Sequence, residues 1–171
     1  MRGMDVVIRP ALAHDFDEMI TLSSKTHLSD MYKTLIPADE YERFSKTYEP
    51  GAERSARGIG TLSSRHSSRD WHMAVAEYDG EVVGFTVALH EGNMLKLRGL
   101  FVDPDFQGQG IGSALFDHSM TWRRGAEPVR LVVLKENRHA QRLYQSRGFT
   151  LVGRVESLFF GAEQVMMERI N

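Results

Sequence analysis

The sequence contains no cysteine among its 171 residues. This absence excludes disulfide bonds, thiolate metal sites, iron–sulfur clusters and cysteine nucleophiles, and it fits a reducing compartment. The sequence also has no large excess of either charge, since it contains 21 lysine and arginine residues and 23 aspartate and glutamate residues. The chain therefore has no basic excess of the kind that binds nucleic acid, and we expect no nucleic-acid partner.

Long apolar runs and metal-ligand patterns are missing as well. No stretch approaches the roughly 20 apolar residues of a membrane-spanning helix, and Met1 to Asp5 lack the apolar core of a signal peptide. We therefore expect a cytoplasmic protein with no membrane partner. No metal is expected either, because no metal-ligand spacing is formed by His14, His27, His66, His72, His118 and His139.

Apolar periodicity and turn residues predict one α/β or α+β domain over residues 1–171, with a mixed sheet. The expected strands are 6–10, 71–78, 81–90, 94–102, 129–134, 150–155 and 165–170. The mostly apolar run at 129–134 suits a strand buried on both faces. Helices are expected over 110–124 and 137–146 and after Asp15, which would form a capping box with Glu18.

The segment Thr26–Arg69 has the weakest pattern. A helix is expected between Pro37 and Pro50, and Ser55–Arg69 is rich in serine, arginine and glycine. Because it has few apolar anchors, this stretch is predicted to be a mobile loop with at most a short helix over 52–57. We expect the segment to shape a substrate site through its aromatic residues, which are Tyr32, Tyr41, Phe44 and Tyr48.

Three alternating glycines, Gly108, Gly110 and Gly112, separate the strand at 94–102 from the helix that follows. Glycine lets a loop turn its amide groups inward, and a helix start adds free N–H groups and a positive dipole end. Together they suit a phosphate or pyrophosphate, although a plain tight turn explains the glycines equally well. A P-loop and a dinucleotide loop fit poorly, because no lysine follows and the third glycine comes one position early.

The run Gln107–Gly112 resembles the Gln/Arg-x-x-Gly-x-Gly/Ala pattern of the GNAT superfamily of acyl-CoA-dependent N-acetyltransferases. A second motif of that family follows in 134–149, with the expected spacing of Asn137, Ala140, Tyr144 and Gly148-Phe149. The two motifs span roughly Met94 to Phe149, and the strand order extends the resemblance to nearly the whole chain except 26–69. It implies a mixed, mostly antiparallel sheet of six or seven strands flanked by about four helices.

The resemblance also implies acetyl-CoA as the acyl donor and assigns residues to it. Main-chain groups of Leu100, Phe101 and Val102 would pair with the pantetheine arm as an added strand would. Asn137 would hydrogen-bond the arm, unless it only caps its helix. Tyr144 would protonate the leaving thiolate, unless it only packs in the core. The pyrophosphate would lie on the amides of Gln107, Gly108, Gln109, Gly110, Ile111, Gly112 and Ser113.

In this family the amine attacks the thioester directly, and the N–H of Val102 would meet the developing oxyanion. The base is left open between water and four candidates, which are Glu91, His90, Glu77 and Glu156. Lys96 and Arg98 could favour an anionic acceptor or simply be solvated.

We expect a primary amine of a small molecule as acceptor. Three alternatives remain: a protein N-terminus or lysine, a non-catalytic acyl-CoA sensor, and a nucleotide-binding module. A homodimer and a longer acyl chain are both compatible with the sequence.

Overall fold

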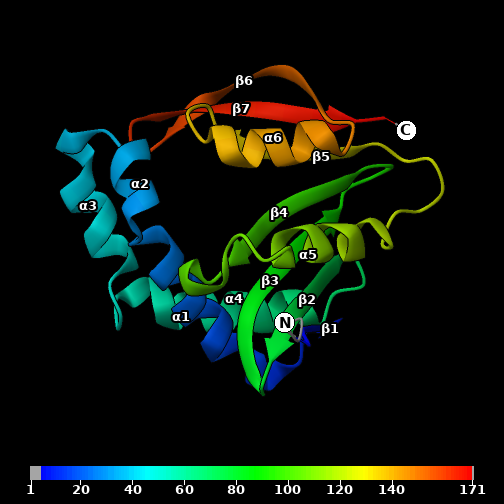
Figure 1. The fold of residues 1–171 in the computed structure, drawn as a ribbon, viewed down its shortest axis with the longest axis horizontal. Helices are drawn as coiled ribbons and strands as arrows, with labels where there is room; N and C mark the ends of the chain where they lie inside the picture. Colours follow the sequence, from blue (N-terminus) through cyan, green and yellow to red (C-terminus); the bar gives the residue numbers. More distant parts are fainter. Residues whose placement is uncertain (1–4, 171) are drawn as a thin grey trace.

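The computed structural model describes residues 5–170, without the side chains of residues 53–57 and 59. One seven-stranded sheet runs through the molecule in the order β1-β2-β3-β4-β5-β7-β6 (Figure 1). The strands are β1 (Val7–Pro10), β2 (Trp71–Tyr78), β3 (Glu81–His90), β4 (Leu95–Val102), β5 (Val129–Leu134), β6 (Thr150–Phe159) and β7 (Ala162–Arg169). The helices are α1 (Phe16–His27), α2 (Asp30–Leu35), α3 (Ala38–Tyr48), α4 (Glu53–His66), α5 (Ile111–Met120) and α6 (Arg138–Ser146), with short 3-10 turns η1 (Ala13–Asp15) and η2 (Pro104–Phe106).

The sheet is mixed and mostly antiparallel, as expected. Only β4 and β5 run parallel, because the α5 crossover joins them, and every other neighbouring pair is antiparallel. The boundaries of β2, β3 and β5 are those predicted from the sequence. The turn between β2 and β3 places Asp79 and Gly80 at φ 52° and 84°, as a tight hairpin of this type requires.

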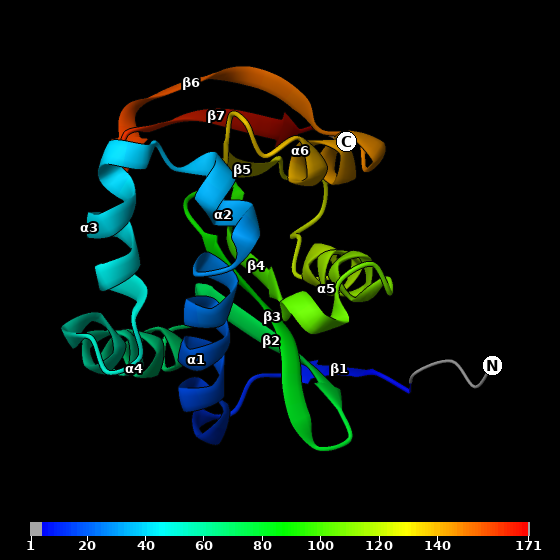
Figure 2. The ribbon, with the colours of Figure 1, turned by 60° about the vertical axis from the view of Figure 1, so that its left-hand side comes forward.

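Helices cover both faces of the sheet (Figure 2). On one face, Met19 of α1 and Leu62 of α4 pack on Val75, Phe85 and Val87 of the sheet. On the other face, α5 packs through buried side chains on β3 and β4, and α6 lies over β5 and β7. The central strands β3 and β4 therefore lie between two hydrophobic cores, one on each face of the sheet.

The described residues form six α-helices, where about four were expected. The prediction of a mobile loop over Ser55–Arg69 was wrong, because α4 occupies most of it. Its contacts are tertiary: Leu62 is buried, and the guanidinium of Arg65 lies 4.1 Å from the centre of the Trp71 ring. Gly58 permits a close approach of α1, since a Cβ there would come within 2.5 Å of Ile20 Cδ1. Packing thus overrides the poor helix propensity of this stretch.

The capping box predicted for Asp15 and Glu18 was also wrong. The carboxylate of Asp15 is almost fully buried, accepts from the Leu12 N–H at 2.7 Å, and pairs with the guanidinium of Arg9. Glu18 accepts instead from the Val82 N–H at 2.9 Å. Asp15 therefore ties the start of α1 to β1 through an ion pair that sequence spacing alone did not reveal.

Candidate active site

Strands β4 and β5 separate after a short stretch of pairing. They pair over only three residues each, and a register shift against β3 leaves Arg98 as a bulged residue of β4. Beyond the bulge, β4 pairs with β3 alone, so its other edge is open as far as Val102. The expectation that β5 is buried on both faces was wrong here, because Val132 faces this opening and is 45% exposed.

The open edge of β4 presents backbone hydrogen-bonding groups. The Asp103 N–H donates to Val83 O of β3 at 2.9 Å. Because successive N–H groups of a strand point to opposite edges, the N–H of Val102 points to the open side. The Gln107 side chain donates from Nε2 to Val102 O at 3.1 Å and fixes the following loop to the strand end.

The glycine loop leads directly into α5. Gly108 and Gly110 have φ values of +77° and +84°, a region that L-residues rarely adopt. Gly110 is the N-cap of α5 and supplies no capping side chain, so first-turn N–H groups are left for another partner. Lys25 of α1 holds the start of the loop, with Nζ 2.7 Å from Asp103 Oδ1 and 2.6 Å from Asp105 Oδ2.

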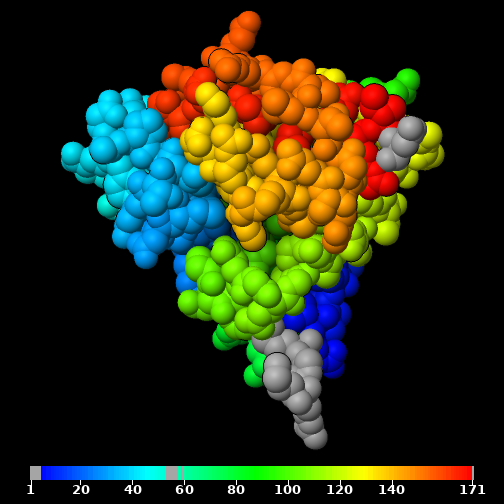
Figure 3. Space-filling view, turned by 45° about the horizontal axis from the view of Figure 1, so that its top comes forward, coloured from blue at the N-terminus to red at the C-terminus, as the bar shows by residue number. Residues whose placement is uncertain are grey.

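One cavity of about 420 Å³, the donor cavity, collects the predicted cofactor residues. It lies between the end of β4, the glycine loop, α2 and α6, and Figure 3 shows a hollow where their surfaces meet. Gln109 does not line it. The predicted residues that do are Leu100, Phe101, Val102, Gln107, Gly108, Gly110, Ile111, Gly112, Ser113, Asn137 and Tyr144. Lining residues that sequence reasoning missed include Thr26, Met31, His139 and Arg142.

Asn137 and Tyr144 reach the donor cavity from α6. Asn137 Oδ1 accepts from the Ala140 N–H at 3.1 Å, so this residue does cap its helix, and its amide NH₂ is left for other contacts. The Tyr144 ring packs against Phe116 and Phe149 at centroid distances of 6.1 and 5.8 Å. Burial raises the pKa of Tyr144 to about 12, so its hydroxyl stays protonated and can donate at neutral pH.

A second cavity of about 230 Å³, the acceptor cavity, adjoins the first. Both cavities are lined by Tyr32, Phe101, Asn137 and Tyr144, so Tyr144 lies where they meet. Of these two cavities, only the acceptor cavity is lined by His27, Arg98 and Val132. Of the four aromatic residues expected to shape a substrate site, Tyr32 lines both cavities. The other three belong to a neighbouring hydrophobic cluster: Phe44 and Tyr48 are buried in it, and Tyr41 packs against it.

None of the four candidate bases lines either cavity. Glu91 is bound to Lys96, and Glu77 is bound to Arg9. His90 is buried between Glu127 and His72, at 2.9 Å from each.

The fourth candidate, Glu156, is exposed on the edge strand β6.

In the part of the chain that the structure describes, no group of three or more His, Asp or Glu side chains is arranged to hold a metal ion. No helix there has the length and apolar character needed to cross a bilayer.

Comparison with known sequences identifies a GNAT acetyltransferase domain over residues 69–151. The peptidyl-lysine N-acetyltransferase YjaB of Salmonella typhimurium is 37% identical over 84 residues, which are 49% of this chain and 52% of that one. The ribosomal protein bS18-alanine N-acetyltransferase of Escherichia coli is 31% identical over 91 residues, 52% of this chain and 61% of that one. The chain thus spans about half the length of the curated relatives it matches.

Solved structures share the fold over the whole chain. The PaiA N-acetyltransferase of Thermoplasma acidophilum, solved in complex with coenzyme A, superimposes with a TM-score of 0.74 at 20% identity. The match covers 98% of this chain and 100% of that one. The matched domain contains both sequence motifs, so residues 69–151 form a GNAT acetyltransferase domain, and the solved structure shares the fold of the whole chain.

Proposed function

We propose that the protein transfers the acetyl group of acetyl-CoA to a primary amine, without an acyl-enzyme. One observation carries this proposal: the glycine loop, the open edge of β4 and Tyr144 line one cavity, and Tyr144 also lines a second cavity. The first-turn amides of α5 suit the pyrophosphate. The open edge from Leu100 to Val102 suits the amide groups of pantetheine.

The residues at the junction suit the chemistry of direct transfer. The neutral amine attacks the thioester carbonyl, a C–N bond forms, and the Val102 N–H stabilises the oxyanion. When the C–S bond breaks, Tyr144 donates its proton to the sulfur, and the water that accepted the amine proton returns a proton to the tyrosinate. Because the three candidate carboxylates and the candidate histidine line neither cavity, water in the acceptor cavity is the proposed acceptor of the amine proton.

A small-molecule amine is the proposed acceptor. The acceptor cavity is small and lies beside the helical layer formed by α1 and α2, which favours a compact substrate over an extended peptide. A protein amine is the second candidate, because the two curated relatives named above act on peptidyl lysine and on an alanine of a ribosomal protein.

Release of coenzyme A from acetyl-CoA, measured with a panel of small amines and short peptides, tests this proposal. We expect release with small amines and weaker release with peptides. A thermal-shift series with acetyl-CoA, NAD and ATP accompanies it. Stabilisation by NAD or ATP but not by acetyl-CoA would contradict the proposal, and binding without release by any amine would indicate a sensor.

A further inference from the structure

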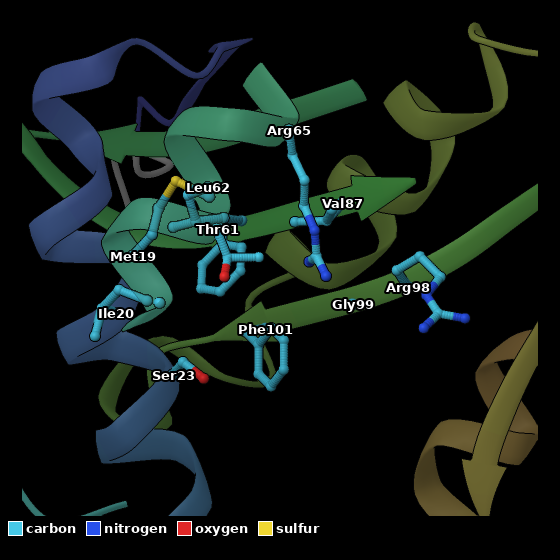
Figure 4. Close-up of a pocket in the computed structure, with 12 residues that line it drawn as sticks. Met19, Ile20, Ser23, Thr61, Leu62, Arg65, Val87, Arg98, Gly99 and Phe101 are labelled. Carbon is cyan, nitrogen blue, oxygen red and sulfur yellow. The ribbon is translucent and has the colours of Figure 1, made fainter. Parts of the chain in front are cut away.

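A third cavity of about 350 Å³ lies between α1, α4 and the strands β3 and β4 (Figure 4). We call it the arginine cavity, because Arg65 of α4 and Arg98 of β4 both line it. Its remaining wall is largely apolar and includes Met19, Ile20, Leu62, Phe85, Val87 and Phe101. Ser23 and Thr61 add hydroxyl groups.

The arginine cavity shares part of its wall with the acceptor cavity. Arg98, Gly99 and Phe101 line both the arginine cavity and the acceptor cavity. The acceptor cavity in turn reaches Tyr144 at the junction with the donor cavity. The acceptor cavity and the arginine cavity therefore lie next to each other along β4.

The guanidinium groups of Arg65 and Arg98 differ from the neighbouring cation in having no carboxylate partner among the described residues. In the described part of the chain, neither Arg65 nor Arg98 forms an ion pair with a carboxylate, whereas the adjacent Lys96 is paired with Glu91. Burial, and then the like charge of Arg98, lower the pKa of Arg65. Figure 4 shows Arg65 extending from α4 toward β4, the strand that carries Arg98.

Two like charges that line one cavity, in a wall that contains no described carboxylate, favour a bound anion. Arg65 is also oriented by stacking on Trp71, so little side-chain freedom remains to be lost when an anion binds. No described carboxylate lines the arginine cavity or the acceptor cavity. A second ammonium group on the substrate would therefore find no partner there.

We infer that the acceptor is an amine that carries an anionic group, a carboxylate or a phosphate, which Arg98 and Arg65 bind while the amine reaches Tyr144. The carbon chain between the two groups would lie against the apolar wall of the arginine cavity. This inference rests on the proposed function and specifies its substrate class. It predicts discrimination against neutral monoamines and against diamines of the same length.

A matched acceptor series tests the inference directly. We would compare kcat/KM for ω-aminocarboxylates, ω-aminoalkyl phosphates, plain alkylamines and α,ω-diamines of equal chain length. We expect at least one of the anionic series to exceed the matched alkylamine by about tenfold or more, the size of one or two charged hydrogen bonds. Equal kcat/KM for anionic and neutral amines would overturn the inference while leaving the proposed acetyl transfer intact.

Single variants assign the effect to the two arginines. Arg98→Gln and Arg65→Gln should each lower the ratio of kcat/KM for the anionic acceptor to kcat/KM for the matched alkylamine about tenfold or more. Lys96→Gln is the matched control, because this neighbouring cation lines neither cavity. Arg98→Glu should shift the preference toward diamines. An anionic preference that survives both Gln variants would overturn the assignment.

A binding measurement keeps the test independent of turnover. The chain has two tryptophans, so a Trp122→Phe protein reports on Trp71 alone, whose ring lies beneath the Arg65 guanidinium. We expect saturable change of its fluorescence with ω-aminocarboxylate in the presence of coenzyme A, and loss of that response in Arg98→Gln. No saturable response would overturn the inference, whereas failure of acetyl-CoA to stabilise the protein would instead contradict the proposed function.

Discussion

The phenol of Tyr144 combines two properties that a proton donor at this place needs. It lines both the donor and the acceptor cavity, and its raised pKa of about 12 keeps it protonated over the working pH range. Tyr144→Phe keeps the ring contacts with Phe116 and Phe149 and removes only the hydroxyl. We predict a fall in kcat of about 10²–10⁴-fold, a similar KM for acetyl-CoA and a Tm within a few degrees of wild type.

The matched control for this variant is Tyr41→Phe, which removes a phenol that lines neither cavity. The wild-type enzyme should also show no alkaline loss of kcat attributable to Tyr144 below about pH 11, since its pKa is raised rather than lowered. A Tyr144→Phe enzyme with wild-type kcat under conditions where chemistry limits the rate would exclude the phenol as the donor.

The buried Asp15 carboxylate should make the free energy of unfolding depend on pH. The hydrogen bonds from Arg9 hold the pKa of this buried carboxylate below its usual value, against the opposing effect of burial. A lowered folded-state pKa contributes stability above the unfolded pKa of about 3.9, and this contribution is lost as the pH falls through the folded value. Asp15→Asn should therefore lower the free energy of unfolding at pH 7 by about 2 kcal/mol.

Thermal unfolding followed from pH 7 to pH 2 checks this expectation. The Tm difference between wild type and Asp15→Asn, roughly 5 °C at pH 7, should shrink below pH 4 as the wild-type carboxylate is protonated. Asp117→Asn serves as the control, because Asp117 forms an exposed pair with Arg147 that should contribute under 1 kcal/mol. A constant Tm difference across the whole pH range would refute the assignment.

At the scale of elements, the glycine loop and α5 act together. A Cβ on Gly110 would meet nothing in the protein within 4 Å, so the backbone angle and the proposed ligand are what require glycine. Gly110→Asp would place a carboxylate in the proposed pyrophosphate site, and we predict at least a tenfold loss of acetyl-CoA affinity by calorimetry. Gly125→Asp introduces the same residue at a φ of +65° away from the cavity, and it should bind acetyl-CoA normally. Equal affinities in the two variants would locate the pyrophosphate elsewhere.

The elements that sequence reasoning predicted well are those whose signal is local. Strands β2 and β3 flank a two-residue Asp-Gly turn, and the glycine loop and Asn137 follow spacings that a family pattern fixes. The helix α4 has no such local signal, because its serine- and glycine-rich sequence is held by contacts with Ile20 of α1 and Trp71 of β2, which lie outside the helix. Its existence depends on tertiary packing that periodicity does not encode.

Across the whole molecule too, features with a local sequence signal could be predicted, and features that depend on tertiary packing could not. The donor side of the site could be predicted because one continuous segment, from β4 through α6, supplies nearly all of it. The acceptor and arginine cavities are lined by residues of α1, α2, α4, β4 and β5, among other elements, and only the fold brings His27, Arg65 and Arg98 to their walls. No spacing within the sequence relates these three residues, so their grouping could only be found in the structure.

Whole-molecule response to ligands provides the last test, through hydrogen–deuterium exchange over residues 26–69. In α2, Met31 and Tyr32 line the donor cavity, so coenzyme A alone should slow exchange there. An acceptor amine added to the coenzyme A complex, where no turnover occurs, should further slow exchange in α4, which lines the arginine cavity.

Ligand at 100 times its Kd stabilises the bound state by about 2.7 kcal/mol, so amides that open only with ligand release should exchange up to about 100-fold more slowly. The helix α3 supplies the internal control, because Phe44 and Tyr48 are buried in a core cluster and α3 lines none of the three cavities described here. Unchanged exchange throughout residues 26–69 would show that the segment only stabilises the fold, and specificity would then have to reside in β4 and β5.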